Sequence, residues 1–132
     1  MARLYRVILP VPDIEAATTF YAAILGAPGK RVSPGRHYFD CEGTILACYD
    51  PIADGDKHSM PANPEHIYLA VDDLDDAYAR CKAAHAHFPT GKTGGSQLAS
   101  IAKRPWGETS FYLRDPFGNP VCFVSRGTMF TG

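Results

Sequence analysis

The stretch Glu-His-Ile-Tyr-Leu-Ala-Val-Asp-Asp-Leu-Asp-Asp-Ala, residues Glu65–Ala77, joins a short apolar run to an acidic helix start. An earlier copy, Arg-Val-Ile-Leu-Pro-Val-Pro-Asp-Ile-Glu-Ala-Ala, occupies Arg6–Ala17. Under the shift that lays Arg6 on His66, the identical pairs are Leu9 and Leu69, Val11 and Val71, Asp13 and Asp73, and Ala17 and Ala77. Because both copies place a strand pattern before a capped helix, the sequence predicts two similar halves.

The first half is predicted to form a strand, a helix and then three strands. Leu4–Val11 is an apolar run suited to a strand, and Asp13 stands where the N-cap of a helix belongs. Gly26 supplies the left-handed stop of that helix. The helix has one apolar face, made of Ile14, Ala17, Phe20, Tyr21, Ile24 and Leu25. The strands that follow are expected at Lys30–Ser33, His37–Cys41 and Thr44–Tyr49, with a turn at Glu42-Gly43.

The second half repeats this order after a connecting loop rich in proline, Pro51–Pro64. His66–Val71 is the predicted strand, and either Asp72 or Asp73 caps the next helix. Further strands are predicted at Gln97–Ala102, Glu108–Arg114 and Pro120–Ser125, with a hairpin loop at Asp115–Asn119 and a terminal tail at Gly127–Gly132. We therefore expect one domain, residues 1–132, with a first module at about 1–57 and a second at about 65–126.

Length and composition restrict the class of protein. The chain has 132 residues, enough for one domain with a real core, and its apolar content of 45% is typical of globular proteins. A net charge of -1 and a pI near 6.5 argue against a nucleic-acid partner. No apolar run reaches the roughly 18 residues of a membrane span, and no secretory signal pattern is seen, so a cytoplasmic protein with four reduced cysteines is expected.

Three motifs resemble the vicinal oxygen chelate superfamily, which includes glyoxalase I, bleomycin-resistance proteins and extradiol dioxygenases. They are Phe20-Tyr21 followed by Leu25-Gly26, Pro105-Trp106-Gly107, and the run Phe111–Pro120. The resemblance covers nearly the whole chain. It implies an α+β fold in which two βαβββ modules form a curled mixed sheet around a cavity, with the helices on the outside. It also implies a homodimer.

The metal-dependent members of that superfamily hold a divalent ion at four positions, which the resemblance carries onto Arg6, Thr44–Tyr49, His66 and Cys122. In Thr44–Tyr49, Leu46 and Cys48 point one way and Ala47 and Tyr49 the other, and none is a carboxylate or histidine. Arginine offers only donors and a fixed positive charge. Only His66 is an ordinary ligand, so we expect no metal and no other cofactor; the alternative is zinc on His66, Cys48 and Cys122.

Several of these residues are candidates for contacts with a ligand. Arg6 interrupts an apolar strand, where it either reaches to water or binds an anionic oxygen from a cavity wall. His66 is either a hydrogen-bonded strand residue or a group that binds or protonates a ligand. Other candidates are the aromatics that could line a pocket, Phe39, Tyr68, Trp106 and Tyr112, and the thiols Cys48 and Cys122. Taken singly, residues of these types are more often part of the core.

Three functions remain open from the sequence. The first is a metal-free protein that binds a small aromatic or anionic molecule, such as an antibiotic, in the manner of bleomycin-resistance proteins. The second is a glyoxalase-like lyase or isomerase, or a dioxygenase, with His66 as the surviving ligand or as an acid or base. The third is an interaction module whose cavity is vestigial. Fold alone does not choose among them.

Overall fold

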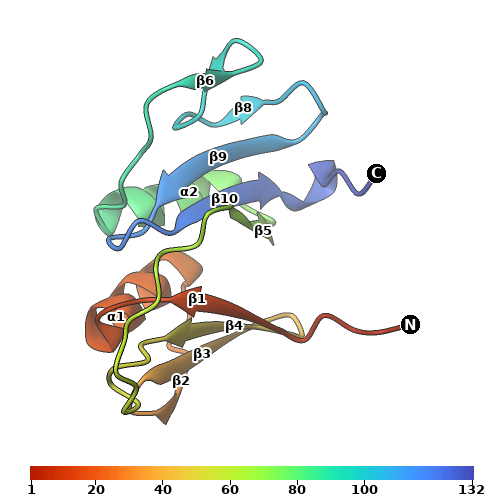
Figure 1. The fold of residues 1–132 in the computed structure, drawn as a ribbon. Helices are drawn as coiled ribbons and strands as arrows, with labels where there is room; N and C mark the ends of the chain where they lie inside the picture. The colour runs from red at the N-terminus through yellow and green to blue at the C-terminus, as the bar shows by residue number, and fades with distance from the viewer. The chain divides into compact units, whose positions relative to one another are not determined.

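The computed structural model describes residues 1–132, which divide into two units, Met1–Asn63 and Pro64–Gly132. Each unit is an α+β assembly of one four-stranded mixed sheet with a helix on one face, as predicted (Figure 1). The prediction that the two modules form a single domain stays a prediction. Neither helix has the length and hydropathy that crossing a bilayer requires.

The first unit has the strand order β1-β4-β3-β2. Its elements are β1 (Arg6–Pro10), α1 (Ile14–Leu25), β2 (Lys30–Ser33), β3 (Arg36–Cys41) and β4 (Thr44–Tyr49). Strand β1 runs parallel to β4, and the other pairs are antiparallel. The predicted caps of α1 are confirmed, because the Asp13 carboxylate accepts the amide of Ala16 at 3.1 Å and Gly26 has φ 67°.

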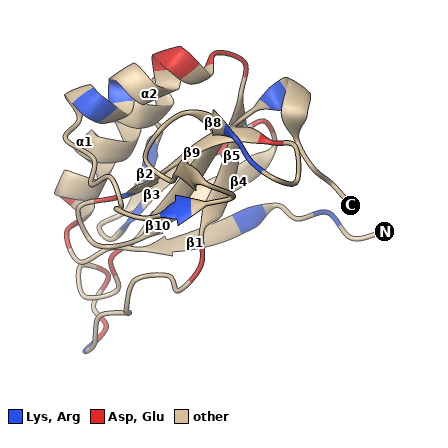
Figure 2. Cartoon of the chain, turned by 90° about the horizontal axis from the view of Figure 1, so that it is seen from above, with Lys and Arg blue, Asp and Glu red and all other residues tan.

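The second unit has the strand order β5-β10-β9-β8, with a small hairpin outside it. Its elements are β5 (Ile67–Val71), α2 (Leu74–Ala83), the hairpin strands β6 (Lys92–Thr93) and β7 (Ser96–Gln97), β8 (Ala102–Lys103), β9 (Thr109–Arg114), β10 (Pro120–Ser125) and the short helix η1 (Arg126–Thr128). Asp73 caps α2 by accepting the amide of Asp76, whereas Asp72 pairs with Arg126 at 2.8 Å. The acidic start and basic end of α2 match its macrodipole (Figure 2).

One face of each sheet is covered by its helix, and we call the other the open face. In the first unit Tyr21 of α1 packs against Phe39, with ring centroids 6.5 Å apart. In the second unit Tyr78 of α2 meets Phe111 edge-on at 5.1 Å, and Phe111 stacks on Phe123. Because side chains alternate along a strand, the neighbours of these core residues lie on the open faces.

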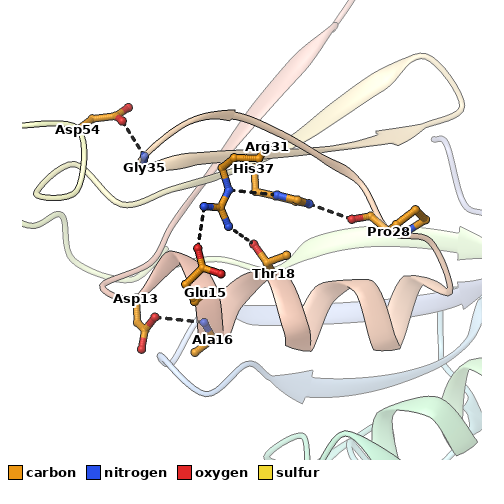
Figure 3. A network of polar contacts seen from close by, with 9 residues as sticks. All are labelled: Asp13, Glu15, Ala16, Thr18, Pro28, Arg31, Gly35, His37 and Asp54. Atoms are coloured by element: carbon orange, nitrogen blue, oxygen red, sulfur yellow. Dashed lines mark hydrogen bonds and ion pairs between the residues drawn. The ribbon is translucent and has the colours of Figure 1, made fainter.

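A polar network ties β2 and β3 to α1 in the first unit (Figure 3). Arg31 bonds Glu15 at 2.7 Å and Thr18 at 3.2 Å, and its Nε donates to Nδ1 of His37 at 3.3 Å. Nδ1 of His37 therefore carries no proton, so Nε2 donates to the Pro28 carbonyl at 2.9 Å. The buried histidine thus has a structural explanation.

The predicted strand Gln97–Ala102 is wrong. Strand β7 ends at Gln97 and β8 begins at Ala102, and the residues between them form a turn. The cause is Arg104, whose guanidinium draws the carbonyls of Gln97, Leu98 and Ser100 to itself at 2.9–3.2 Å. Three carbonyls that turn toward one side chain do not alternate in direction as they do along a strand, although the Leu98 carbonyl also accepts the amide of Tyr112 at 2.9 Å.

Candidate ligand site

The first unit places two of the predicted site residues on opposite faces of its sheet. Arg6 pairs with Ile45, and Leu9 pairs with Cys48, so Arg6 and Cys48 alternate to different sides. Cys48 is fully buried on the face that α1 covers, and it is not available to a ligand on the open face. Ala47 and Tyr49 share the open face with Arg6, which settles the register that the sequence left uncertain.

Two guanidinium groups converge on one phenol oxygen on this open face. Arg6 and Arg36 each donate an Nη1 hydrogen bond of 3.3 Å to Tyr38 Oη. Arg36 also lies over the ring of Tyr49, 4.0 Å from its centroid, and pairs with Asp54 at 3.7 Å. The phenol accepts both bonds, so its own proton remains to be donated to an anion.

The second unit gathers the other predicted residues on the open face of its sheet. The ring of His66 meets Tyr112 edge-on at 5.0 Å and lies 6.2 Å from Tyr68. Cys122 pairs with both Tyr68 and Tyr112 in the ladder, so the three side chains share this face. They differ in depth, because Tyr112 and Cys122 are buried beneath Leu98 whereas Tyr68 is exposed.

Burial makes Cys122 a poor nucleophile. Desolvation raises the pKa of its thiol to about 12, which strongly disfavours the thiolate that nucleophilic attack needs. Cys48 and Cys81 are also buried, and burial raises the pKa of Cys81 to about 12. Cys41 is partly exposed, and its pKa is raised by burial and by the acidic neighbours Asp40 and Glu42.

We therefore expect only one thiol, Cys41, to react slowly with Ellman's reagent in the native protein at pH 8, and all four to react in denaturant. The Cys41→Ser variant serves as the control, since its native form should release almost no chromophore. Rapid modification of Cys122 near neutral pH, located by peptide mapping, would contradict this account.

His66 is held in its neutral form. Burial, and then the positive charge of Arg114, lower its pKa below the ordinary value of 6.5. A lowered pKa means that the unfolded chain binds the proton more readily than the folded one. The resulting contribution to stability is present above pH 6.5 and is lost as the pH falls through the folded-state pKa.

An NMR titration should therefore place the His66 pKa below 6.5, and Arg114→Gln should raise it by removing the second cause. Arg80→Gln, which changes an arginine of α2 on the other face of the sheet, is the matched control and should leave the value unchanged. A His66 pKa above 6.5 in the wild-type protein would show that an acidic partner, rather than burial, dominates.

A hollow of about 420 Å³ opens on the same face of the second unit. Its floor is made by Tyr68 and Ala70 of β5 and Val124 of β10. The walls come from the loop before β9 and from the end of the chain, namely Trp106, Glu108, Met129, Phe130 and Thr131. Residues of the predicted terminal tail, Gly127–Gly132, thus form one side of the hollow.

Glu108 joins two walls of this hollow. Its side-chain oxygens accept the indole N–H of Trp106 at 2.8 Å and the amide of Phe130 at 3.0 Å. Glu108 is only 9% exposed, so these hydrogen bonds are largely shielded from solvent. Sequence reasoning missed this residue, because a glutamate at the start of a strand carries no sign of burial.

Arg104 supports the loop beside the hollow and was also missed. It is 1% exposed, and besides the three loop carbonyls it bonds Ser110 through the hydroxyl at 3.0 Å and through the carbonyl at 2.9 Å. Its guanidinium lies 5.1 Å from the ring centroid of Tyr112. The arginine thereby fixes the loop that places Leu98 over Tyr112 and Cys122.

Two βαβββ units, each with one free sheet face, define the vicinal oxygen chelate class of fold. A family model described as the glyoxalase/bleomycin resistance protein/dioxygenase superfamily matches residues 3–123, and the chain belongs to that superfamily. Comparison with curated protein sequences gives no match.

Solved structures share this fold at low sequence identity. A glyoxalase-related enzyme from Fulvimarina pelagi has a TM-score of 0.74 and 17% identity, covering 100% of this chain and 94% of that one. A glyoxalase/bleomycin resistance protein from Albidiferax ferrireducens has a TM-score of 0.68 and 23% identity, with coverage of 92% and 96%. A lactoylglutathione lyase from Agrobacterium tumefaciens has a TM-score of 0.64 and 22% identity, covering 95% of this chain and 94% of that one.

The residues at the superfamily's metal positions do not make a metal site. Arg6 is a cation that donates to Tyr38, and Ala47 on the same face has no donor atom for a metal. Cys122 is a thiol that is 0% exposed, in place of the carboxylate or imidazole that a hard divalent ion prefers, which leaves His66 as a single ordinary ligand. No group of three or more His, Cys, Asp or Glu side chains is arranged to hold an ion.

Proposed function

We propose that this protein binds a small organic molecule without a metal ion, in the manner that the name bleomycin resistance protein suggests for its superfamily. The observation that supports the proposal is the hollow on the open face of the second unit. Its volume of about 420 Å³ lies in the range of small-molecule sites, and apolar and aromatic side chains make most of its wall. A flat ring held between Tyr68 and Trp106 is the ligand that suits these walls.

The proposal that the protein also binds anionic ligands rests on residues of the first unit. Arg6 and Arg36 share the oxygen of Tyr38, so two guanidinium groups of like charge lie close to one another. A carboxylate or phosphate oxygen beside them would relieve that repulsion and accept forked hydrogen bonds. We propose that Arg6 contacts anionic ligands in this way.

The single tryptophan of the chain gives a direct assay, because Trp106 lines the hollow. A panel of small aromatic and anionic compounds is titrated while Trp106 emission is followed with excitation at 295 nm. A compound that enters the hollow is expected to change the emission saturably and to raise the melting temperature.

Two variants, one in each unit, show which unit binds each kind of compound. Tyr68→Ala should weaken the binding of aromatic compounds at least about tenfold, as expected when a residue that anchors the ligand is lost. Tyr5→Ala, which removes an exposed tyrosine of the first unit, is the control and should leave the affinities for the aromatic compounds unchanged. Arg6→Ala should weaken the binding of the anionic compounds only. This binding is measured by the shift in melting temperature. If no compound changes either signal, the binding function is wrong.

We also propose that the chain forms a homodimer, as the resemblance implies. Sedimentation equilibrium should give twice the chain mass of 14.4 kDa. A monomer at micromolar concentration would contradict the dimer and would leave the binding test in the second unit unaffected, since all lining residues belong to one chain.

A further inference from the structure

Glu108 places an unpaired negative charge in the wall of the hollow. Glu108 is 9% exposed as a residue, and its carboxylate forms no ion pair with a Lys, Arg or His side chain. A buried carboxylate is normally paired with a cation, because burial removes the water that would stabilise its charge. The structure therefore leaves the counter-charge of Glu108 to be supplied from the hollow.

The two hydrogen bonds that Glu108 accepts do not use up its capacity. One oxygen accepts from Trp106 and the other from the amide of Phe130, and both donors are neutral. A carboxylate has about four lone-pair sites, so each oxygen keeps one for a further donor. The bonds orient the carboxylate and leave its charge uncompensated.

The other walls suit a cation as well. Tyr68, Trp106 and Phe130 bring three aromatic rings to one hollow, and Met129 adds a polarisable thioether. The face of an aromatic ring attracts a positive charge, and indole does so most strongly. Burial, with the neighbouring acidic groups Cys122 and Glu108, also raises the pKa of Tyr68, so its hydroxyl keeps its proton.

We infer that the hollow of the second unit selects ligands that carry a positive charge next to an aromatic or apolar group, with Glu108 as the counter-ion and Tyr68, Trp106 and Phe130 as the ring walls. The inference rests on the proposed binding function and names the ligand class for that site. It differs from the anion contact proposed for Arg6, which belongs to the first unit.

Three probes that share one ring and differ in charge test this selection. Phenethylammonium is the cation, 2-phenylethanol the neutral analogue and 3-phenylpropanoate the anion. Trp106 emission, excited at 295 nm where the probes do not absorb, reports binding at low and high salt. The wild-type protein should bind phenethylammonium at least about tenfold more tightly than 2-phenylethanol, and the preference should shrink in high salt.

The Glu108→Gln variant removes the charge and keeps an acceptor oxygen. It should reduce the preference for phenethylammonium to within about twofold of 2-phenylethanol while the neutral probe binds as before. Asp75→Asn, which removes an exposed carboxylate from α2, is the matched control and should retain the preference.

The outcomes separate the two proposals. If 2-phenylethanol binds as tightly as phenethylammonium to the wild-type protein, charge selection is wrong and the binding function stands. If none of the three probes, nor any member of the wider panel, changes Trp106 emission, the binding function itself fails. The comparison of probes on the wild-type protein decides the inference even where Glu108→Gln does not fold.

Discussion

The Arg104→Ala variant is expected to lose about 3 kcal/mol of unfolding free energy, because hydrogen bonds to a charged group contribute roughly 1.5–3 kcal/mol. Arg104 is 1% exposed and bonds four different residues, so alanine removes every one of these hydrogen bonds and leaves a void beside Tyr112. Urea denaturation followed by circular dichroism measures the change. For a domain of this size the midpoint should fall markedly.

Lys103→Ala is the control, since the neighbouring lysine is exposed and its loss should cost no more than about 0.5 kcal/mol. Arg104→Lys should recover only part of the loss, because an ammonium cannot reproduce the fork that reaches Gln97 and Ser110 together. A wild-type midpoint for Arg104→Ala would show that the loop between β7 and β8 is held by other contacts.

The second large effect is expected for Asp115→Ala, which should lose about 3 kcal/mol of unfolding free energy, because hydrogen bonds to a charged group contribute roughly 1.5–3 kcal/mol. The Asp115 carboxylate is fully buried and accepts the amides of Phe117 and Asn119 and the side-chain amide of Asn119, at 2.8–2.9 Å. These bonds shape the hairpin between β9 and β10. Without them the turn loses the groups that set its register.

Thermal and urea unfolding of Asp115→Ala and Asp115→Asn measure this contribution. The asparagine variant keeps one acceptor oxygen and should lose less than the alanine variant. Asp75→Ala, an exposed aspartate of α2, should change the unfolding free energy by no more than about 0.5 kcal/mol. Equal losses for Asp115→Ala and Asp75→Ala would mean that the hairpin does not depend on the buried carboxylate.

The fold followed from the sequence wherever local signals agreed with one another. Asp13 and Gly26 mark the ends of α1, and the turn Glu42-Gly43 separates β3 from β4 as predicted. Glu42 takes a positive φ of 54° there, a value that non-glycine residues rarely adopt. Each of these features depends on residues within a few positions along the chain, which is why the sequence alone predicts them.

The site could be predicted only in part, because its remaining features depend on distant contacts. Tyr68 and Trp106 were expected to line a pocket from their aromatic character, and they lie together in the hollow of the second unit. Glu108 and Arg104 have no local pattern, because charged residues are expected at the surface until three-dimensional neighbours are known. The sequence also could not tell which face Cys48 occupies, since that depends on the register of β1 against β4.

We propose that the hollow binds its ligand without a metal ion. The most direct measurement is a titration of Trp106 emission with the best compound of the panel, on protein dialysed against a chelator, and again after addition of zinc, nickel, iron or manganese. We predict a saturable curve in the metal-free protein whose midpoint does not move when metal is added. A curve that appears only with added metal, and disappears in His66→Ala, would contradict the claim.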